Sequence, residues 1–132
     1  MRETLILVNP AAGGGRAEGR WERARREAGD LGGARVMVPA DRGAFRRAVR
    51  EAADRGCERV VAVGGDGTIH LTAGTLLEHG AGEQVTLGLV PAGTGSDLAR
   101  ALKVPRDPAA ALRRALLGAA AAIDAGRCTG ER

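Results

Sequence analysis

Glycines gather in three short segments of the sequence, and each segment also carries polar side chains. The segments are NPAAGGG (Asn9–Gly15), GGDGT (Gly64–Thr68) and PAGTGSD (Pro91–Asp97). Glycine lets a backbone approach a ligand closely and adopt positive φ angles, and free N–H groups at a helix start bind phosphate oxygens. Three such segments predict a polyphosphate held mainly by backbone amides, although each segment taken singly also fits a tight strand-to-helix turn.

Asp66 is the carboxylate inside the GGDGT segment and is the candidate catalytic residue. Its structural alternative is a helix cap or a turn-stabilising hydrogen bond. A carboxylate beside phosphates is repelled unless a metal ion or a proton intervenes, which makes Asp66 a candidate Mg²⁺ ligand as well. A third interpretation is that Asp66 accepts the proton of an attacking hydroxyl during phosphoryl transfer.

The other polar residues near these segments have weaker signals. Two roles are open for Asp97, a cap of the helix that follows it or a member of the site, and we expect the cap. We expect His79 to lie at the surface, whereas His70 is near enough to GGDGT to remain a candidate site residue. The sequence contains no GxxxxGK[ST] motif, its single lysine is Lys103, and no strand-linked GxGxxG with a ribose-binding acid is present. Both familiar nucleotide fingerprints are therefore excluded.

The apolar pattern predicts strands and helices that alternate along the chain and bring the glycine segments together. The predicted strands are Thr4–Val8, Ala34–Val38, Arg59–Val63, Val85–Val90 and Ala120–Asp124. The predicted helices are Arg16–Ala28, Ala44–Arg55 (capped by Asp41), Thr68–Glu78, Ser96–Leu102 and a helix from Asp107-Pro108 to near Gly118. This alternation predicts a three-layer, Rossmann-like α/β fold, in which a parallel sheet has helices on both faces. All three glycine segments follow strands, so they should meet at the carboxyl edge of the sheet, where ligands bind.

Composition narrows the class of protein. The chain has 132 residues with 44% hydrophobic and 27% charged residues, which suits one globular domain. Its net charge of +4 comes almost entirely from arginine mixed with Glu and Asp on predicted helices. This mixture favours solvated helix faces, with some attraction to anionic ligands or membrane surfaces, over nucleic-acid binding. Cys57 and Cys128 lack metal-ligand spacing and are expected to be reduced thiols of a cytosolic protein.

The segments ILVNPAAGGG, VVAVGGDGTIH and LGLVPAGTGSDLARAL, in this order and spacing, resemble the catalytic domain of the diacylglycerol kinase family. That family includes bacterial lipid kinases and sphingosine and ceramide kinases. The resemblance implies that the chain binds ATP with Mg²⁺ and passes the γ-phosphoryl group to a lipid hydroxyl, such as that of diacylglycerol. It also implies that residues 1–132 are the nucleotide-binding domain, and that the family's C-terminal β-rich domain is absent from this chain.

The same resemblance assigns site residues and a cellular location. The nucleotide-binding positions it implies are Asn9, Pro10, Gly64, Gly65, Asp66, Gly67, Thr68, Gly93, Thr94 and Gly95. Asp66 matches the catalytic carboxylic acid. The predicted apolar stretches are too short for a signal peptide or a membrane span, so we expect a cytoplasmic protein with peripheral contact at the inner membrane face. Its expected partners are ATP, a lipid acceptor and a second copy of the chain, with no nucleic acid.

Two positions depart from the family pattern. Leu71 stands where the family often has Glu, and Ser96 stands where the family commonly has Asn. Together with the absent second domain, these departures predict poor activity for the isolated chain. They also keep two alternatives open: an enzyme similar to NAD kinase, which shares the GGDGT-type loop, and a nucleotide-binding module without catalysis.

Overall fold

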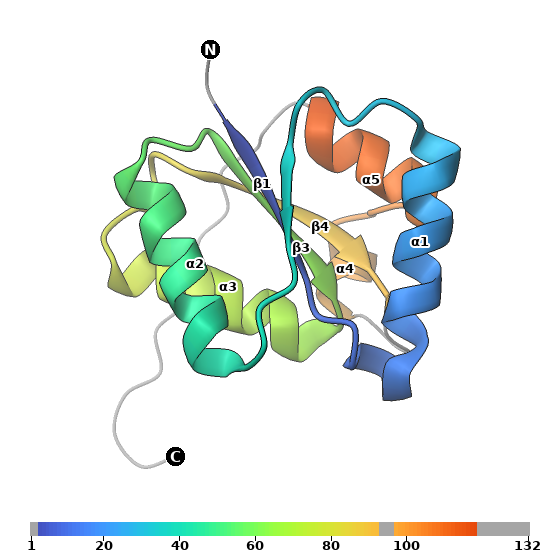
Figure 1. The fold of residues 1–132 in the computed structure, drawn as a ribbon, viewed down its shortest axis with the longest axis horizontal. Helices are drawn as coiled ribbons and strands as arrows, with labels where there is room; N and C mark the ends of the chain where they lie inside the picture. The colour runs from blue at the N-terminus through green and yellow to red at the C-terminus, as the bar shows by residue number, and fades with distance from the viewer. Residues whose placement is uncertain (1–2, 93–96, 119–132) are drawn as a thin grey trace.

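A four-stranded parallel sheet with helices on both faces forms the protein (Figure 1). The computed structural model describes residues 3–92 and 97–118. The strands are β1 (Thr4–Val8), β2 (Arg35–Met37), β3 (Arg59–Gly64) and β4 (Thr86–Pro91), in the order β2-β1-β3-β4. The helices are η1 (Ala12–Gly15, 3-10), α1 (Arg16–Ala28), α2 (Arg42–Asp54), α3 (Asp66–Glu78), α4 (Asp97–Ala101) and α5 (Pro108–Leu117). The predicted α/β class is confirmed.

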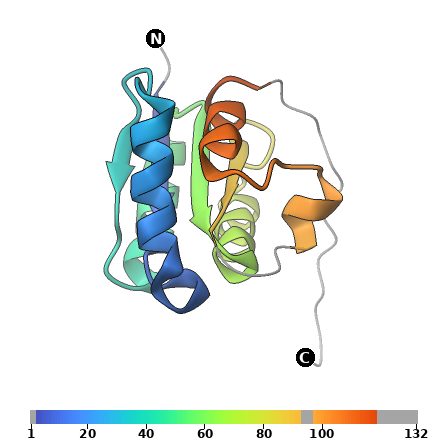
Figure 2. The ribbon, with the colours of Figure 1, turned by 90° about the vertical axis from the view of Figure 1, so that its right-hand side faces the viewer.

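Alternate residues of β1 pack into two separate hydrophobic cores, one on each face of the sheet. Ile6 and Val8 of β1 face the layer made by α1 and α5, where Trp21 is buried. Leu5 and Leu7 face the layer made by α2 and α3. Figures 1 and 2 show these two helix layers on opposite sides of the sheet. Because β1 is buried on both faces, its sequence is a continuous apolar run rather than an alternating one.

The helix starts follow local capping signals. Asp41 Oδ1 accepts a hydrogen bond from the Ala44 N–H at 2.8 Å and begins α2. Asp107 Oδ2 accepts one from the Ala110 N–H at 3.0 Å and begins α5, with Pro108 in the first turn. Both caps agree with the sequence-based expectation.

Several boundaries differ from those predicted. α3 begins at Asp66 rather than Thr68, so Asp66 and Gly67 of the GGDGT segment are helical rather than loop. β2 is shorter than predicted and spans only Arg35–Met37. The predicted strand Ala120–Asp124 lies outside the described residues.

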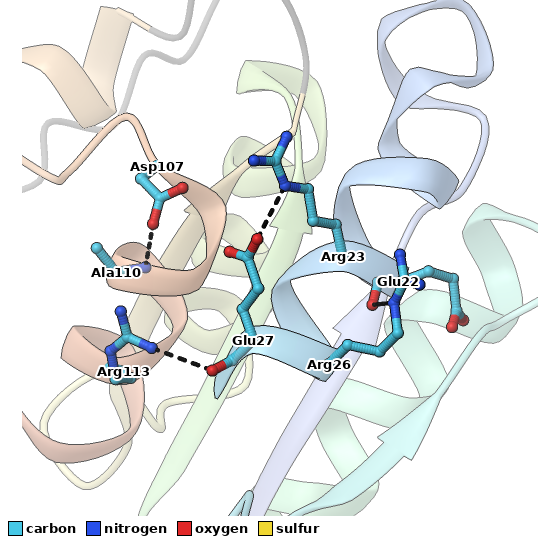
Figure 3. A network of polar contacts seen from close by, with 7 residues as sticks. All are labelled: Glu22, Arg23, Arg26, Glu27, Asp107, Ala110 and Arg113. Carbon is cyan, nitrogen blue, oxygen red and sulfur yellow. Dashed lines mark hydrogen bonds and ion pairs between the residues drawn. The ribbon is translucent and has the colours of Figure 1, made fainter. Parts of the chain in front are cut away.

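Polar contacts tie α1 to α5 and engage part of the arginine charge (Figure 3). Arg23 Nε lies 3.0 Å from Glu27 Oε1, and this hydrogen bond raises the pKa of the Arg23 guanidinium. Arg113 of α5 donates to the Glu27 carbonyl at 3.5 Å. These exposed pairs fit the expectation of solvated helix faces, and each contributes little to stability.

Cys57 belongs to the core rather than to the surface. Its side chain is buried, and burial, followed by a hydrogen bond to Glu3, raises the pKa of its thiol. Within the described residues Cys57 is a free cysteine, while Cys128 lies outside them. A buried thiol with a raised pKa has little thiolate character and is inert.

Gly88 lets β4 and α5 approach closely. A Cβ atom at Gly88 would lie 2.8 Å from Ala115 Cβ and 3.1 Å from Val61 Cγ2. Both neighbours are held by the helix backbone or the sheet, so neither can move away easily. The small side chains here set the distance between α5 and the sheet.

We therefore predict that Gly88→Ala destabilises the fold by about 1–3 kcal/mol, because it overpacks this contact. Urea unfolding would measure the change. The control is Gly19→Ala in α1, where a new Cβ meets nothing within 4 Å. That variant should gain about 0.5–1 kcal/mol from helix propensity. Equal effects at the two glycines would contradict the packing argument.

Candidate functional site

The chain leaves β1 and β3 toward opposite faces of the sheet. β1 leads into α1 on one face, and its neighbour β3 leads into α3 on the other (Figure 1). The connections diverge between these two strands and leave a crevice at their carboxyl ends, which is the usual ligand site of open α/β sheets. The first two glycine segments both border this crevice, as their positions after strands predicted.

A side-chain hydrogen bond joins the two segments across the crevice. Asn9 Nδ2 donates to Thr68 Oγ1 at 2.9 Å, and the Asn9 backbone N–H donates to the Val63 carbonyl at 2.9 Å. Thr68 is buried, with 5% of its surface exposed. Asn9 therefore connects the end of β1 to the first turn of α3 and sets the distance between them.

Gly64 permits α3 to turn back tightly on β3. A Cβ atom at this position would lie 2.7 Å from Thr68 Cβ and still closer to Thr68 Oγ1. The next residue, Gly65, is the N-cap of α3 in an extended conformation with a φ of −94°. The glycine requirement at Gly64 thus comes from close packing and not from a positive φ.

The first glycine segment has the left-handed backbone. Gly13, Gly14 and Gly15 have φ angles of 63°, 69° and 95°. Three consecutive residues in this region are unfavourable for any residue with a Cβ. The turn allows the chain to leave β1 and enter α1 at once, and it places Ala12 and Gly13 beside Asn9.

A cavity of about 400 Å³ occupies the crevice. Its walls come from the first glycine segment, from the start of α3 and from the connection between β2 and α2. The lining residues are Asn9, Ala12, Gly13, Pro39, Ala40, Asp41, Arg42, Phe45, Gly65, Gly67, Thr68 and Leu71. The volume lies in the range of small-molecule sites.

Of the nucleotide positions expected from the resemblance, the structure brings four to this cavity. They are Asn9, Gly65, Gly67 and Thr68. Gly64 lies directly behind them in β3, whereas Pro10 is not among the described residues that line the cavity. Gly93, Thr94 and Gly95 lie outside the described residues, as does Ser96.

The wall contributed by Pro39–Phe45 was not expected from the sequence. This segment has no glycine cluster, so its residue types gave no signal. The place of this segment in the chain did carry a signal, because the segment follows the carboxyl end of β2, and β2 pairs directly with β1. Arg42 is the cation of this wall, and Leu71 is the apolar residue opposite, on α3.

Asp66 lies in the exposed first turn of α3 and contacts the next helix. Its Oδ2 atom accepts a hydrogen bond from the backbone N–H of Asp97 at 3.0 Å. The Asp97 carboxylate itself lies 3.7 Å from Arg100 Nη1 in the first turn of α4. Asp66 therefore positions the start of α4. This role of Asp66 was not expected from the sequence, which pointed to Asp97 itself as the cap of that helix.

The two histidines have different surroundings. His79 Nε2 lies 2.7 Å from Asp54 Oδ1 at the surface, as expected for a surface residue. His70 is exposed on α3, one turn after Asp66. Among the described residues no group of three or more His, Cys, Asp and Glu side chains could hold a metal ion. A cation that relies on one carboxylate plus phosphate and water, as Mg²⁺ often does, still fits Asp66.

Comparison with known proteins gives one consistent result. Residues 3–128 match the family model described as the diacylglycerol kinase catalytic domain. A probable lipid kinase YegS-like from Enterobacter sp. (strain 638) is 43% identical over 63 residues, which are 48% of this chain and 21% of that protein. A probable lipid kinase YegS-like from Klebsiella pneumoniae (strain 342) is 42% identical over 66 residues, or 50% of this chain and 22% of that protein.

The fold comparison agrees. A putative diacylglycerol kinase from Bacillus anthracis str. Sterne superimposes with a TM-score of 0.69 at 25% identity, covering 85% of this chain and 40% of that chain. The matched part of this chain thus spans about a fifth of the curated relatives' length. In the parts of the chain that the structure describes, we find no helix with the length and apolar character needed to cross a bilayer.

The bond between Asn9 and Thr68 can be tested by a double-mutant cycle. We predict a coupling free energy of about 0.5–1.5 kcal/mol between Asn9→Ala and Thr68→Val, because each substitution removes one partner of the same partly buried hydrogen bond. Urea unfolding of the two single variants and the double variant measures it. Additive effects of the two substitutions would show that the bond does not hold the segments together.

Proposed function

The chain belongs to the diacylglycerol kinase catalytic domain family, and we propose that it is the nucleotide-binding half of an ATP-dependent lipid kinase. The proposed reaction transfers the γ-phosphoryl group of ATP to a lipid hydroxyl, with diacylglycerol as the representative acceptor. Support comes from the family match and from one structural observation at the start of α3.

That observation is that no side chain caps the N-terminus of α3. α2 and α5 begin at aspartates that accept N–H groups of the first turn, whereas α3 begins after Gly65, which has no side chain to offer. The first N–H groups of a helix have no partner within the helix. Those of α3 border the 400 Å³ cavity, where phosphate oxygens are the ligands that such groups favour.

We assign Asp66 the part of general base. It lies in the same helical turn as these N–H groups, and its hydrogen bond from Asp97 holds one carboxylate oxygen in place. The Asp66 carboxylate accepts the proton of the acceptor hydroxyl while the hydroxyl oxygen attacks the γ-phosphorus, and the bond from the γ-phosphorus to the β,γ-bridging oxygen breaks and releases ADP. Mg²⁺, held by Asp66 together with phosphate oxygens and water, would neutralise phosphate charge when bound.

The lipid acceptor and the complete active site require more than this chain. The chain covers about a fifth of its curated relatives and 40% of a structural relative. We propose that a β-rich domain elsewhere in the gene product supplies the rest of the acceptor surface. Peripheral contact with a membrane follows from a lipid acceptor.

One observation favours a second candidate function, a nucleotide-binding module without catalysis. Leu71 lines the cavity at the position where an acid is common in the family, and its side chain packs against the core between the sheet and α2. The wall of the cavity made by α3 therefore lacks the acid common in the family, and the carboxylate at the start of α3 is that of Asp66.

The nucleotide assignment predicts a loss of ATP affinity in Gly65→Val. The new side chain enters the cavity beside the first turn of α3, so we expect at least a tenfold weaker Kd, or about 1.4 kcal/mol. Isothermal titration calorimetry with ATP and Mg²⁺ measures it. Gly19→Val on α1 is the control, since it makes the same change outside the cavity. An ATP affinity that is unchanged by Gly65→Val would contradict the proposed phosphate-binding role of the GGDGT segment.

The catalytic assignment predicts that Asp66→Asn lowers phosphoryl transfer about 10²–10⁴-fold in the intact gene product, because the amide cannot take the proton. Asn still accepts the Asp97 N–H, so folding and ATP binding should persist. The assay follows ADP release with diacylglycerol, and with NAD as the acceptor of the NAD kinase-like alternative. Full activity of Asp66→Asn contradicts the assignment, and ATP binding without transfer in the wild type indicates the module without catalysis.

A further inference from the structure

A second cavity lies between α2 and α3, on the side of Asp66 away from the first glycine segment. Its volume is about 510 Å³. The two helices lie side by side over the same face of the sheet (Figure 1). We call this cavity the α2–α3 groove, and its lining residues are Arg42, Arg46, Asp66, Gly67, His70, Leu71, Gly74, Thr75 and Glu78. Arg42, Gly67 and Leu71 line both cavities, so the groove continues from the crevice.

The α2 wall of the groove is cationic. Arg42 and Arg46 are four residues apart, and residues at this spacing lie on the same side of a helix. Among the described residues neither has an ion-pair partner, in contrast to Arg23, Arg55 and Arg100. Two guanidinium groups on one wall, without carboxylates of their own, provide bidentate donors suited to a phosphate.

The α3 wall is opened by a glycine that the packing does not require. Gly74 lies in the interior of α3, and a Cβ atom there would meet nothing within 4 Å. A glycine inside a helix is unfavourable relative to alanine, and neither a tight contact nor a positive φ explains this one. Its effect is to widen the groove beside the Leu71 and Thr75 side chains, which gives the groove a partly apolar floor.

The charges along the groove are ordered. Arg42 and Arg46 occupy the half near the crevice, while Glu78 lies in the last turn of α3 at the other end. Asp66 also lines this groove and does not line the 400 Å³ cavity, and its carboxylate accepts the Asp97 N–H. An anionic group with an adjoining apolar part would be attracted by Arg42 and Arg46 and repelled by Asp66 and Glu78, so it fits best beside Arg46.

We propose that the α2–α3 groove binds the phosphate of an anionic phospholipid headgroup and so docks the crevice against the bilayer surface. The bilayer as the source of the phosphate rests on the proposed lipid kinase function. The groove shares Arg42, Gly67 and Leu71 with the 400 Å³ cavity proposed for ATP, but Arg46, His70 and Gly74 line the groove alone. The bound lipid anchors the chain and is not itself the reacting group.

The test compares two adjacent arginines of α2 in vesicle flotation. Arg46 lines the groove, whereas Arg47 is exposed and lines neither cavity. We expect Arg46→Gln to weaken binding to phosphatidylcholine vesicles containing phosphatidylglycerol by about fivefold, the effect of one arginine near an anionic surface. Arg47→Gln should change it less than twofold. Pure phosphatidylcholine vesicles should bind neither variant nor the wild type.

Two further variants separate the groove from general charge and from folding. Glu78→Gln removes the opposing carboxylate and should strengthen binding to the anionic vesicles. Gly74→Leu fills the groove with a side chain that favours helix, so binding should weaken while Tm rises. A Gly74→Leu protein that binds as well as the wild type would overturn the groove as the site.

The remaining outcomes decide between lipid and other sources of phosphate. Equal losses in Arg46→Gln and Arg47→Gln would mean diffuse attraction and overturn the proposal. NMR shifts of groove residues with inorganic phosphate, without Arg46-dependent vesicle binding, would also overturn it. ATP titration of the same variants keeps the two proposals separate: Arg46→Gln should retain wild-type ATP affinity, and absent ATP binding in the wild type would refute the kinase proposal alone.

Discussion

The hydrogen bond from Asn9 to Thr68 holds the candidate site together. It spans the point where β1 and β3 send the chain to opposite faces of the sheet, next to the backbone hydrogen bond from the Asn9 N–H to the Val63 carbonyl. Gly64 makes the bond possible, because any Cβ there would displace the Thr68 side chain. The width of the cavity is therefore set by one amide side chain, one hydroxyl and one missing methyl group.

Asp66 is connected to this arrangement through the same helical turn. Its carboxylate accepts the N–H of Asp97, so a hydrogen bond links the start of α3 to the start of α4. In the proposed mechanism the same carboxylate takes the proton of the acceptor hydroxyl. Under that proposal Asp66 combines a helix-capping role with a catalytic role, which sequence patterns treat as alternatives, and the helix that it caps is α4 and not its own.

The helix layer of α2 and α3 differs from that of α1 and α5. α1 and α5 are joined by the Arg113 side chain of α5, which donates to the Glu27 carbonyl, while Arg23 pairs with Glu27 within α1 (Figure 3). On the other face, Arg42 and Arg46 line a groove without such pairing among the described residues. The fold therefore places Arg23 in an ion pair on one face of the sheet and Arg42 and Arg46 along a groove on the other.

Local signals in the sequence determined four strands, the aspartate caps of α2 and α5, the parallel sheet and the meeting of the first two glycine segments at its carboxyl edge. Those features depend on neighbouring residues and on chain connectivity alone. Tertiary structure decided the start of α3 at Asp66, the contact of Asp66 with Asp97, and the entry of Arg42 and Phe45 into the site. Each of these depends on the distance between segments that lie far apart in the chain, and that distance is set by packing across the sheet, such as the Gly64–Thr68 contact, which no single segment encodes.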